Sequence, residues 1–338
     1  MKPVLPDLIS GEALAEARGR IYDSAVRTPL IRLPVSNGPP DRVDRPDRPD
    51  RLTALPPNAI WLKLETLQPV GSFKIRGARN AIGALVPETL AQGIYTASAG
   101  NMALGLAWCA RERRLPFTAI VPNQAPAAKL SKLEKLGARI LPVPYERWWQ
   151  VLEEHHYPDV PGTFIHPVAN PAVIAGNATI GWEILEQLPE VDTVLVPFGG
   201  GGLSCGIGSA LRESGSTARV IGCEIETATP LTAALAAGGP CPVERTPSFV
   251  DGIGGSGLLP EMWPLVRRLV DSAAVVSLQE TREAIRTLIE RVHVVAEGAG
   301  AVPVAAACSG RIPGERVCCV VSGGNIDLGV LVEILAAA

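Results

Sequence analysis

The sequence is poor in several features that point to particular classes of protein. Aromatic residues make up 4% of its 338 residues and the formal net charge is only −3, so neither a nucleic-acid surface nor an anionic-membrane surface is indicated. No apolar run has the length of a membrane span. The seven cysteines include no Cys-x-x-Cys pair, so neither a disulfide framework nor a zinc site is indicated. Residues 1–13 lack the apolar core of a signal peptide, and we therefore expect a cytoplasmic protein.

Apolar and small residues are plentiful instead. The chain is 47% hydrophobic with 34 glycines, which is enough for one large or two medium domains with closely packed helices and sheets. Apolar strand-like runs alternate with helix-like runs from residue 59 onward, and this pattern predicts an α/β fold with parallel sheets. We expect strands near 59–64, 94–97, 117–121, 139–143, 163–165, 193–196, 220–224 and 317–321, and helices near 101–113, 127–136, 145–156 and 172–187.

The strand-rich middle of the chain suggests its domain organisation. About four of the expected strands fall in the block 94–165, which predicts a small domain at 93–168 inserted into a larger one made of 1–92 and 169–338. Residues 41–51, DRVDRPDRPDR, have no strand or helix period and no apolar surface to bury. We expect a mobile charged surface loop there, and a charged docking tail is the alternative.

Lys74 lies in an unusual setting for a lysine. It stands between Phe73 and Ile75 in the run GSFKIRGA at residues 71–78. Burial lowers the pKa of a lysine, and a neutral amine can attack a carbonyl to form a Schiff base with an aldehyde cofactor. The alternative is a structural lysine whose stem is buried and whose ammonium reaches the surface.

A run of four glycines at residues 199–202 follows the apolar strand at 193–196 and precedes a helical stretch. Converging backbone N–H groups and a helix N-terminus favour an anion there, whereas a tight strand–helix turn is the structural alternative. No Gly-Lys-Ser/Thr sequence follows. Glu224 lies near where a ribose-binding acid would be, but with Gly199 as the first position of G-x-G-x-x-G the sixth is Ser204, so the motif is not matched. A single phosphate fits this loop better than a dinucleotide.

With these two features and further ordered motifs, the chain resembles the fold-type II pyridoxal-phosphate enzymes, and within them the threonine/serine dehydratase (ammonia-lyase) group. The resemblance covers about residues 25–327. Its motifs are GSFKIRGA at 71–78, SAGN at 98–101, HPVANP at 166–171, GGGGL at 199–203, EGAGA at 297–301 and SGGNID at 322–327. It implies two parallel-sheet αβα domains similar to the tryptophan synthase β fold, with pyridoxal 5'-phosphate bound by the larger one.

The resemblance also implies roles for individual residues. Lys74 is the implied catalytic residue and cofactor attachment point. The implied cofactor-binding residues are Phe73, Lys74, Asn101, Gly199, Gly200, Gly201, Gly202, Leu203 and Ser322. The implied substrate-binding residues are Ser98, Ala99, Gly100 and Asn101. Taken singly, Asn101 and Glu297 also fit helix caps, and Ser322 also fits a turn hydroxyl.

The implied chemistry is β-elimination from an L-3-hydroxy amino acid, giving a 2-oxo acid and ammonia. Lys74 would remove the α-proton as general base. Ser322 would face the pyridine nitrogen with a neutral hydroxyl, which makes the ring a weaker electron sink and favours elimination over transamination. Related serine racemases have a serine where this chain has Ala99, so we expect poor racemisation.

Several residues depart from the group's usual motifs. Met102, Val168, Ala169 and Asn177 replace larger or more polar residues, which predicts a roomier, more apolar pocket if these side chains line it. We therefore expect activity on serine or threonine and on a bulkier 3-hydroxy amino acid such as phenylserine.

A cation site known from related enzymes is only partly matched. Glu224 and Ala228 fit it, but Pro230 stands where another ligand is often found, so no metal is assigned.

Other activities stay open from the sequence. A β-replacement enzyme and an amino-acid racemase share the implied fold, and a nicotinamide oxidoreductase would use the glycine loop differently. A non-catalytic binding protein is disfavoured because Lys74, Asn101 and Ser322 are all retained. A small amino acid is the expected partner, with no nucleic acid and no membrane, and a homodimer is the family expectation.

Overall fold

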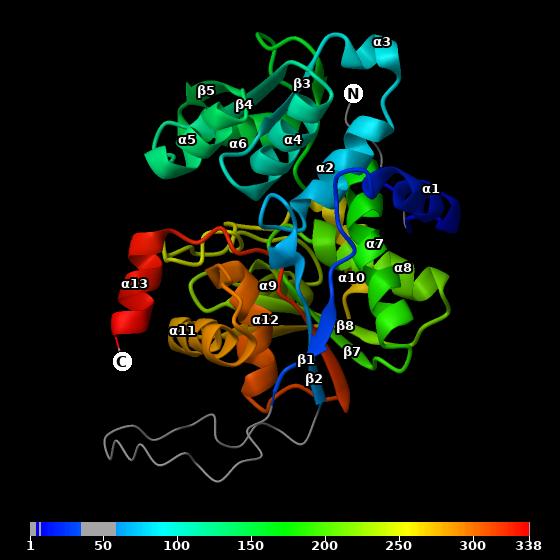
Figure 1. Cartoon of the computed structure of the whole chain (residues 1–338), viewed down its shortest axis with the longest axis vertical. Helices are drawn as coiled ribbons and strands as arrows, with labels where there is room; N and C mark the ends of the chain where they lie inside the picture. Colours follow the sequence, from blue (N-terminus) through cyan, green and yellow to red (C-terminus); the bar gives the residue numbers. More distant parts are fainter. Residues whose placement is uncertain (1–4, 7, 35–58, 338) are drawn as a thin grey trace.

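The computed structural model describes residues 5–6, 8–34 and 59–337, so the charged segment at 41–51 lies outside the described residues. Two separate sheets organise the chain (Figure 1). The larger has six strands in the order β1-β2-β10-β7-β8-β9, and the smaller has four in the order β5-β4-β3-β6. All pairs are parallel except β1 with β2. The predicted α/β fold with parallel sheets is confirmed.

The larger sheet collects strands from both ends of the chain. Its strands are β1 (Leu30–Arg32), β2 (Ala59–Lys63), β7 (Thr193–Pro197), β8 (Arg219–Ile225), β9 (Ser272–Val276) and β10 (Arg316–Val320). Every residue of β7 is buried, as are all but the first residue of β8 and of β10, which is the burial expected of central strands covered on both faces. The strand expected at 317–321 thus forms the middle of this sheet.

The smaller sheet is local in sequence. Its strands are β3 (Ile94–Ala97), β4 (Phe117–Pro122), β5 (Arg139–Val143) and β6 (Thr163–Phe164). The helices between these strands are α4 (Asn101–Glu112), α5 (Ala127–Lys135) and α6 (Tyr145–Glu154). Figure 1 shows this unit stacked above the larger sheet.

The remaining helices surround the larger sheet or connect the two units. They are α1 (Gly11–Ile21), α2 (Lys74–Gly83), α3 (Pro87–Leu90), α7 (Pro171–Gln187), α8 (Gly202–Glu213), α9 (Pro230–Ala237), α10 (Trp263–Leu269), α11 (Leu278–Thr287), α12 (Gly298–Cys308) and α13 (Leu328–Ala336). Three short turns, η1 (Glu65–Leu67), η2 (Pro260–Met262) and the π-helical η3 (Leu288–Val292), complete the description. In the described part of the chain, none of the helices combines the length and hydropathy needed to cross a bilayer.

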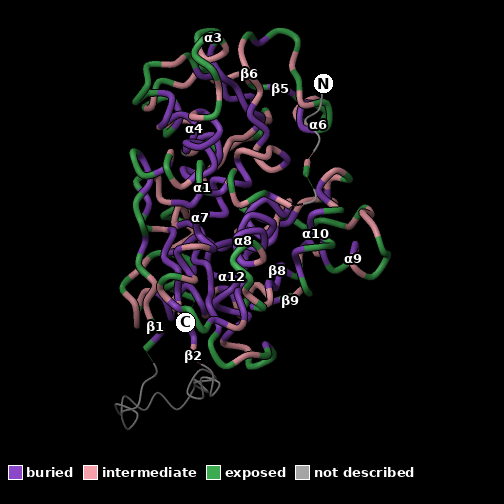
Figure 2. The backbone as a smooth tube through the Cα atoms, turned by 90° about the vertical axis from the view of Figure 1, so that its right-hand side faces the viewer, coloured by how far each residue is buried: buried purple, intermediate pink, exposed green. Residues whose placement is uncertain are grey.

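Local signals explain where the most buried helices begin. The side chain of Asn170 accepts a hydrogen bond from Val173 N and Pro171 occupies the first turn, so α7 has a capped start. Ser277 and Glu280 form a capping box at α11. Figure 2 shows long buried stretches in α7, α8 and α12. α7 and α8 pack against one another, and α12 packs against the larger sheet.

Candidate active site

Parallel strands bring the sequence motifs to one edge. β7 and β10 are neighbours in the larger sheet, so the glycine run that follows β7 and Ser322 that follows β10 leave the same edge. The loop carrying Ser98 leaves the carboxyl end of β3 in the smaller sheet. Ligands of open parallel sheets bind beyond the carboxyl ends of the strands, so these three loops mark the candidate site.

The run that contains Lys74 lies against the end of β10. Phe73 N donates a hydrogen bond to Ser322 O at 3.0 Å, and Ser72 pairs with Gly323 in an isolated β-bridge. Lys74 is the next residue and the first of α2. The backbone therefore brings the residue before Lys74 into contact with Ser322.

The amine of Lys74 has an environment that favours its neutral form. Burial lowers the pKa of Lys74 to about 8, and the negative charge of Glu297 only partly opposes this. Its Nζ donates to Pro167 O at 3.0 Å and lies 5.1 Å from the centre of the Phe73 ring. A lysine with such a pKa is a competent nucleophile and base near neutral pH.

The glycine run forms an open helix start next to Phe73. Gly201 has a φ of +90°, which glycine adopts without strain, and no side chain among the described residues caps α8. Leu203 and Phe73 belong to the same buried apolar cluster. Ser204 Oγ is buried and has no hydrogen-bond partner within the described residues, so a donor is available beside the free N–H groups. These groups match what a phosphate requires.

The side chain of Asn101 makes hydrogen bonds with two residues that the sequence offered no reason to place beside it. Its Nδ2 donates to Glu297 Oε1 at 2.7 Å, and its Oδ1 accepts from Asn325 Nδ2 at 2.9 Å. Asn325 Nδ2 is also 2.8 Å from Val70 O. These contacts fix the orientation of the Asn101 amide and leave it one further N–H to donate.

The side chain of Glu297 lies against Asn101 of the candidate site and does not cap a helix. It precedes α12 but makes no side-chain cap there. Burial, together with the charge of Asp251, raises the pKa of Glu297 to about 7, against the opposing effect of its bond from Asn101. Lys129, which is ion-paired with Asp251, lowers it slightly. Glu297 can therefore hold a proton near neutral pH.

The Ser98–Gly100 loop lies beside the start of α4. Gly100 N donates to Ser98 Oγ at 3.2 Å, and within the described residues no atom lies within 4 Å of the position a Cβ on Gly100 would take. On the next turn of α4, a Cβ on Gly105 would lie 3.2 Å from the backbone of Lys74. The loop is therefore open around Gly100, and the helix that follows it packs closely against the start of α2.

Three residues that the sequence analysis considered for the pocket pack elsewhere. Met102 is 2% exposed and Ala169 is fully buried, each inside an apolar cluster. Asn177 is buried where α2, α7 and α8 meet, with its Nδ2 3.4 Å from Gly202 O. These side chains are packed inside the fold, so they give little support to a roomier pocket.

Glu224 has its carboxylate occupied by helix α9. Its Oε1 accepts from Leu231 N at 2.6 Å, and its Oε2 accepts from Thr232 N at 2.9 Å and Thr232 Oγ1 at 2.7 Å. A carboxylate at a helix N-terminus with three donors is a stable arrangement without a cation.

A buried ion network lies directly behind the site. Arg76 is fully buried and donates to both carboxylate oxygens of Glu65, each at 2.8 Å, and to both of Glu183, at 2.6 and 2.9 Å. Lys63 Nζ donates to Glu183 at 2.6 Å. This network was not predicted from the sequence, because Glu183 lies more than 100 positions from the other members.

Comparison with known proteins agrees with this geometry. The family described as pyridoxal-phosphate dependent enzyme matches residues 45–323. An L-threonine ammonia-lyase of Thermotoga maritima is 40% identical over 283 residues, which cover 82% of this chain and 69% of that protein. A serine racemase of Oryza sativa subsp. indica is 33% identical, covering 82% of this chain and 84% of that protein.

Solved structures give the same result. The structure of maize serine racemase superposes with a TM-score of 0.83 at 30% identity and covers 98% of both chains. The T.th. threonine deaminase superposes with a TM-score of 0.78 at 31% identity, covering 94% of this chain and 99% of that one. The chain therefore belongs to the pyridoxal-phosphate dependent enzymes and is a relative of the L-threonine ammonia-lyases, which are lyases.

Proposed function

We propose that the chain is an ammonia-lyase that converts an L-3-hydroxy amino acid of the serine or threonine type to a 2-oxo acid and ammonia. The observation that carries the proposal is the Lys74 amine, whose pKa is lowered to about 8 and which is adjacent in the chain to Phe73, the residue bonded to Ser322 O. The names of the relatives, L-threonine ammonia-lyase among them, support the same reaction.

The proposed cofactor contacts follow from the donors present. Backbone N–H groups of residues 199–203, with the hydroxyl of Ser204, would hold the phosphate. Phe73 would pack beside the ring, the remaining N–H of Asn101 would donate to the ring oxygen, and Ser322 would face the ring nitrogen. The bound cofactor would supply an aldehyde that links to an amine and a ring that withdraws electrons from the α-carbon.

The chain's own groups would then move the protons. Lys74 Nζ would take the α-proton, because a pKa lowered to about 8 makes the neutral amine far more available near neutral pH than in an ordinary lysine. Pro167 O would hold this amine by accepting a hydrogen bond from Lys74 Nζ at 3.0 Å. The N–H groups and hydroxyl of the Ser98–Gly100 loop would receive the substrate carboxylate at the start of α4.

We propose serine or threonine rather than phenylserine as the substrate. No reported relative has a name that indicates a phenyl substrate. Met102 and Ala169 are packed in apolar clusters. The domain division at 93–168 and a homodimer also stay proposals. All four strands of the smaller sheet fall inside that range, which supports the division.

Racemisation is the second candidate function, since two of the reported relatives are serine racemases. Ala99 argues against it, because an alanine has no group to donate or remove a proton from the opposite face of the α-carbon.

A substrate panel separates these activities. L-serine, L-threonine and L-phenylserine are each incubated with the purified holoenzyme, and ammonia, the 2-oxo acid and the D-enantiomer are quantified. Ammonia and 2-oxo acid from serine or threonine, with little D-serine, are the expected result. D-serine as the main product would make the protein a racemase, and a new thioether formed only with added thiol would make it a β-replacement enzyme.

A further inference from the structure

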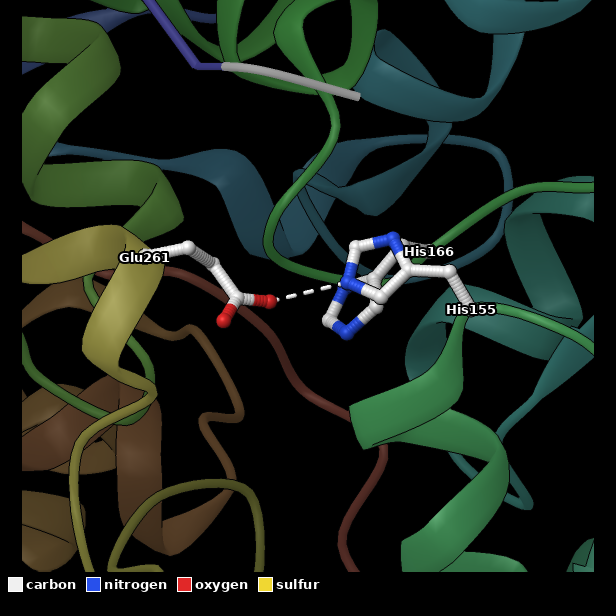
Figure 3. Close-up of side chains that lie close together, drawn as sticks. All are labelled: His155, His166 and Glu261. Carbon is white, nitrogen blue, oxygen red and sulfur yellow. Dashed lines mark hydrogen bonds and ion pairs between the residues drawn. The ribbon is translucent and has the colours of Figure 1, made fainter. Parts of the chain in front are cut away.

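A cluster outside the proposed reacting groups joins the two units of the fold. Figure 3 shows His155, His166 and Glu261 side by side, with ligand atoms within 4.8 Å of one another. The two imidazole rings stack with centroids 4.4 Å apart, and His155 Nε2 lies 2.8 Å from Glu261 Oε1. His155 ends α6 of the smaller unit, whereas Glu261 belongs to η2 beside the larger sheet.

The residue types resemble those of a zinc site, but the hydrogen bonds of His166 oppose that reading. Its Nδ1 accepts from Val168 N at 2.9 Å and from Ala169 N at 2.7 Å. Nδ1 therefore carries no proton, and the neutral ring keeps its proton on Nε2. A metal would have to take the Nε2 lone pair that this tautomer does not offer.

The same two hydrogen bonds shape the backbone next to Lys74. They close a turn in which Pro167 O receives Lys74 Nζ at 3.0 Å. Val168 then faces the glycine run, since a Cβ on Gly200 would lie 2.8 Å from a Val168 methyl and one on Gly202 would lie 3.2 Å from Val168 O. One short turn thus contacts both the proposed base and the proposed phosphate loop.

The turn is also fixed at its far end. Asn170 N donates to Val168 O at 3.0 Å, and Asn170 caps α7 through its side chain. Across the ring of His166 lie His155 on one face and Phe164 at a right angle, with centroids 5.9 Å apart. The imidazole is therefore held from the side while its Nδ1 holds the backbone.

We propose that His166 is a positioning residue: its unprotonated Nδ1 fixes the turn at residues 166–169, which sets Pro167 O for the Lys74 amine and Val168 against the glycine run. His155, anchored by Glu261, acts as a brace that keeps the His166 ring in place. The proposal rests on the proposed function, because it treats Lys74 as the base. It assigns His166 no contact with the reacting atoms.

A matched pair of variants tests this role. In His166→Asn the side-chain oxygen lies near the position of Nδ1 and can accept from Val168 N and Ala169 N, whereas in His166→Gln the acceptor is one carbon further away. We expect His166→Gln to lower kcat by about 10²-fold with KM changed less than about threefold, as for a misplaced catalytic group. His166→Asn should recover kcat to within about threefold of the parent.

A second measurement does not depend on turnover. In the cofactor-free protein, the ¹⁵N shifts of His166 should report the Nε2–H tautomer. The rate at which an amine-directed reagent labels Lys74 should change at least about threefold in His166→Gln and little in His166→Asn. Circular dichroism and the melting temperature of each variant show whether it is folded.

Three results would overturn the proposal. They are a proton on Nδ1 of His166, equal kcat in His166→Gln and the parent, or an equal loss of kcat in His166→Gln and His166→Asn when both variants are folded. Stoichiometric Zn²⁺ binding that both His166→Asn and His155→Gln abolish would also overturn it, in favour of a metal site. If the parent releases no ammonia from any amino acid, the proposed function fails. The tautomer and the labelling of Lys74 still decide the positioning role in that case.

Discussion

Two of the cations of helix α2, Lys74 and Arg76, lie two positions apart in opposite surroundings. Arg76 is fully buried and makes four hydrogen bonds to the carboxylates of Glu65 and Glu183. Lys74 has a backbone carbonyl, Pro167 O, as its hydrogen-bond partner and a partly protonated carboxyl, Glu297, as its nearest acidic influence. Loss of hydration acts on both, so the partners rather than the burial separate a structural cation from a reactive one.

The pKa values express this difference. Burial alone would lower the pKa of Arg76, but the charges of Glu65 and Glu183 outweigh it and raise the pKa. For Lys74 the burial wins and the pKa falls to about 8. Lys63 shares a feature with each of them. Burial lowers its pKa, as it does for Lys74, although the charges of Glu183 and Glu65 oppose this lowering, as they do for Arg76. A buried cation becomes chemically useful when its charge is incompletely compensated.

The largest effect should come from removing the reactive member of the pair. Lys74→Ala should lower ammonia release by about 10³-fold or more, since it removes both the attachment amine and the general base. The melting temperature should change little. Lys132→Ala, at an exposed position of α5, is the matched control and should keep parental kcat. Comparable turnover in Lys74→Ala and the control would remove Lys74 from the mechanism.

The structural member should act on stability. Arg76→Met leaves the buried carboxylate of Glu65 without its cation, so the free energy of unfolding in urea should fall by about 3–5 kcal/mol. Adding Glu65→Gln to this variant should recover part of the loss, because it removes the uncompensated charge. A loss below about 1 kcal/mol would mean that the network is not the stabilising element described here.

The pH dependence of stability should separate Glu297 from the compensated acids. Its pKa rises from 4.5 to about 7 on folding, so the folded chain binds this proton more tightly than the unfolded chain. Stability from this group is therefore complete below pH 4.5 and falls as the pH rises through 7. Glu297→Gln should remove a slope worth on the order of 2–3 kcal/mol from urea unfolding of the cofactor-free protein between these pH values. An unchanged slope would show that Glu297 is ionised throughout.

The smallest effect should come from an ion pair of the same helix in which the acid is exposed to water. Arg79 pairs with Asp23, whose side chain is 72% exposed. Asp23→Asn should change the free energy of unfolding by less than about 1 kcal/mol, because water screens the pair. A loss as large as that of Arg76→Met would contradict the distinction between a pair with a buried acid and a pair with an exposed acid.

The sequence predicted the parts of this molecule that depend on local pattern. Apolar strands such as β7 and the four glycines after it are contiguous signals, and so is the run around Lys74. Two edge elements of the larger sheet were not assigned. β9 is a short run of small residues that is partly exposed, and β1 is three residues long, so neither has a clear apolar pattern.

The contacts that could not be predicted from the sequence join residues that lie far apart in the chain. Arg76 meets Glu183 across 107 positions of sequence, and Asn101 meets Asn325 across 224. The role of His166 depends on which ring nitrogen accepts a backbone N–H, and composition or spacing carries no such information. Motifs therefore indicated the candidate site, while the geometry was needed to propose which of its side chains act through others.

The central claim is that Lys74, and not the buried and ion-paired Lys63, is free to bond the cofactor. The direct measurement is borohydride reduction of the holoenzyme, followed by peptide mapping in a mass spectrometer. The account predicts the reduced cofactor on the peptide that contains Lys74 and none on the peptide that contains Lys63. Cofactor on Lys63, or no covalently fixed cofactor in a protein that still releases ammonia, would contradict it.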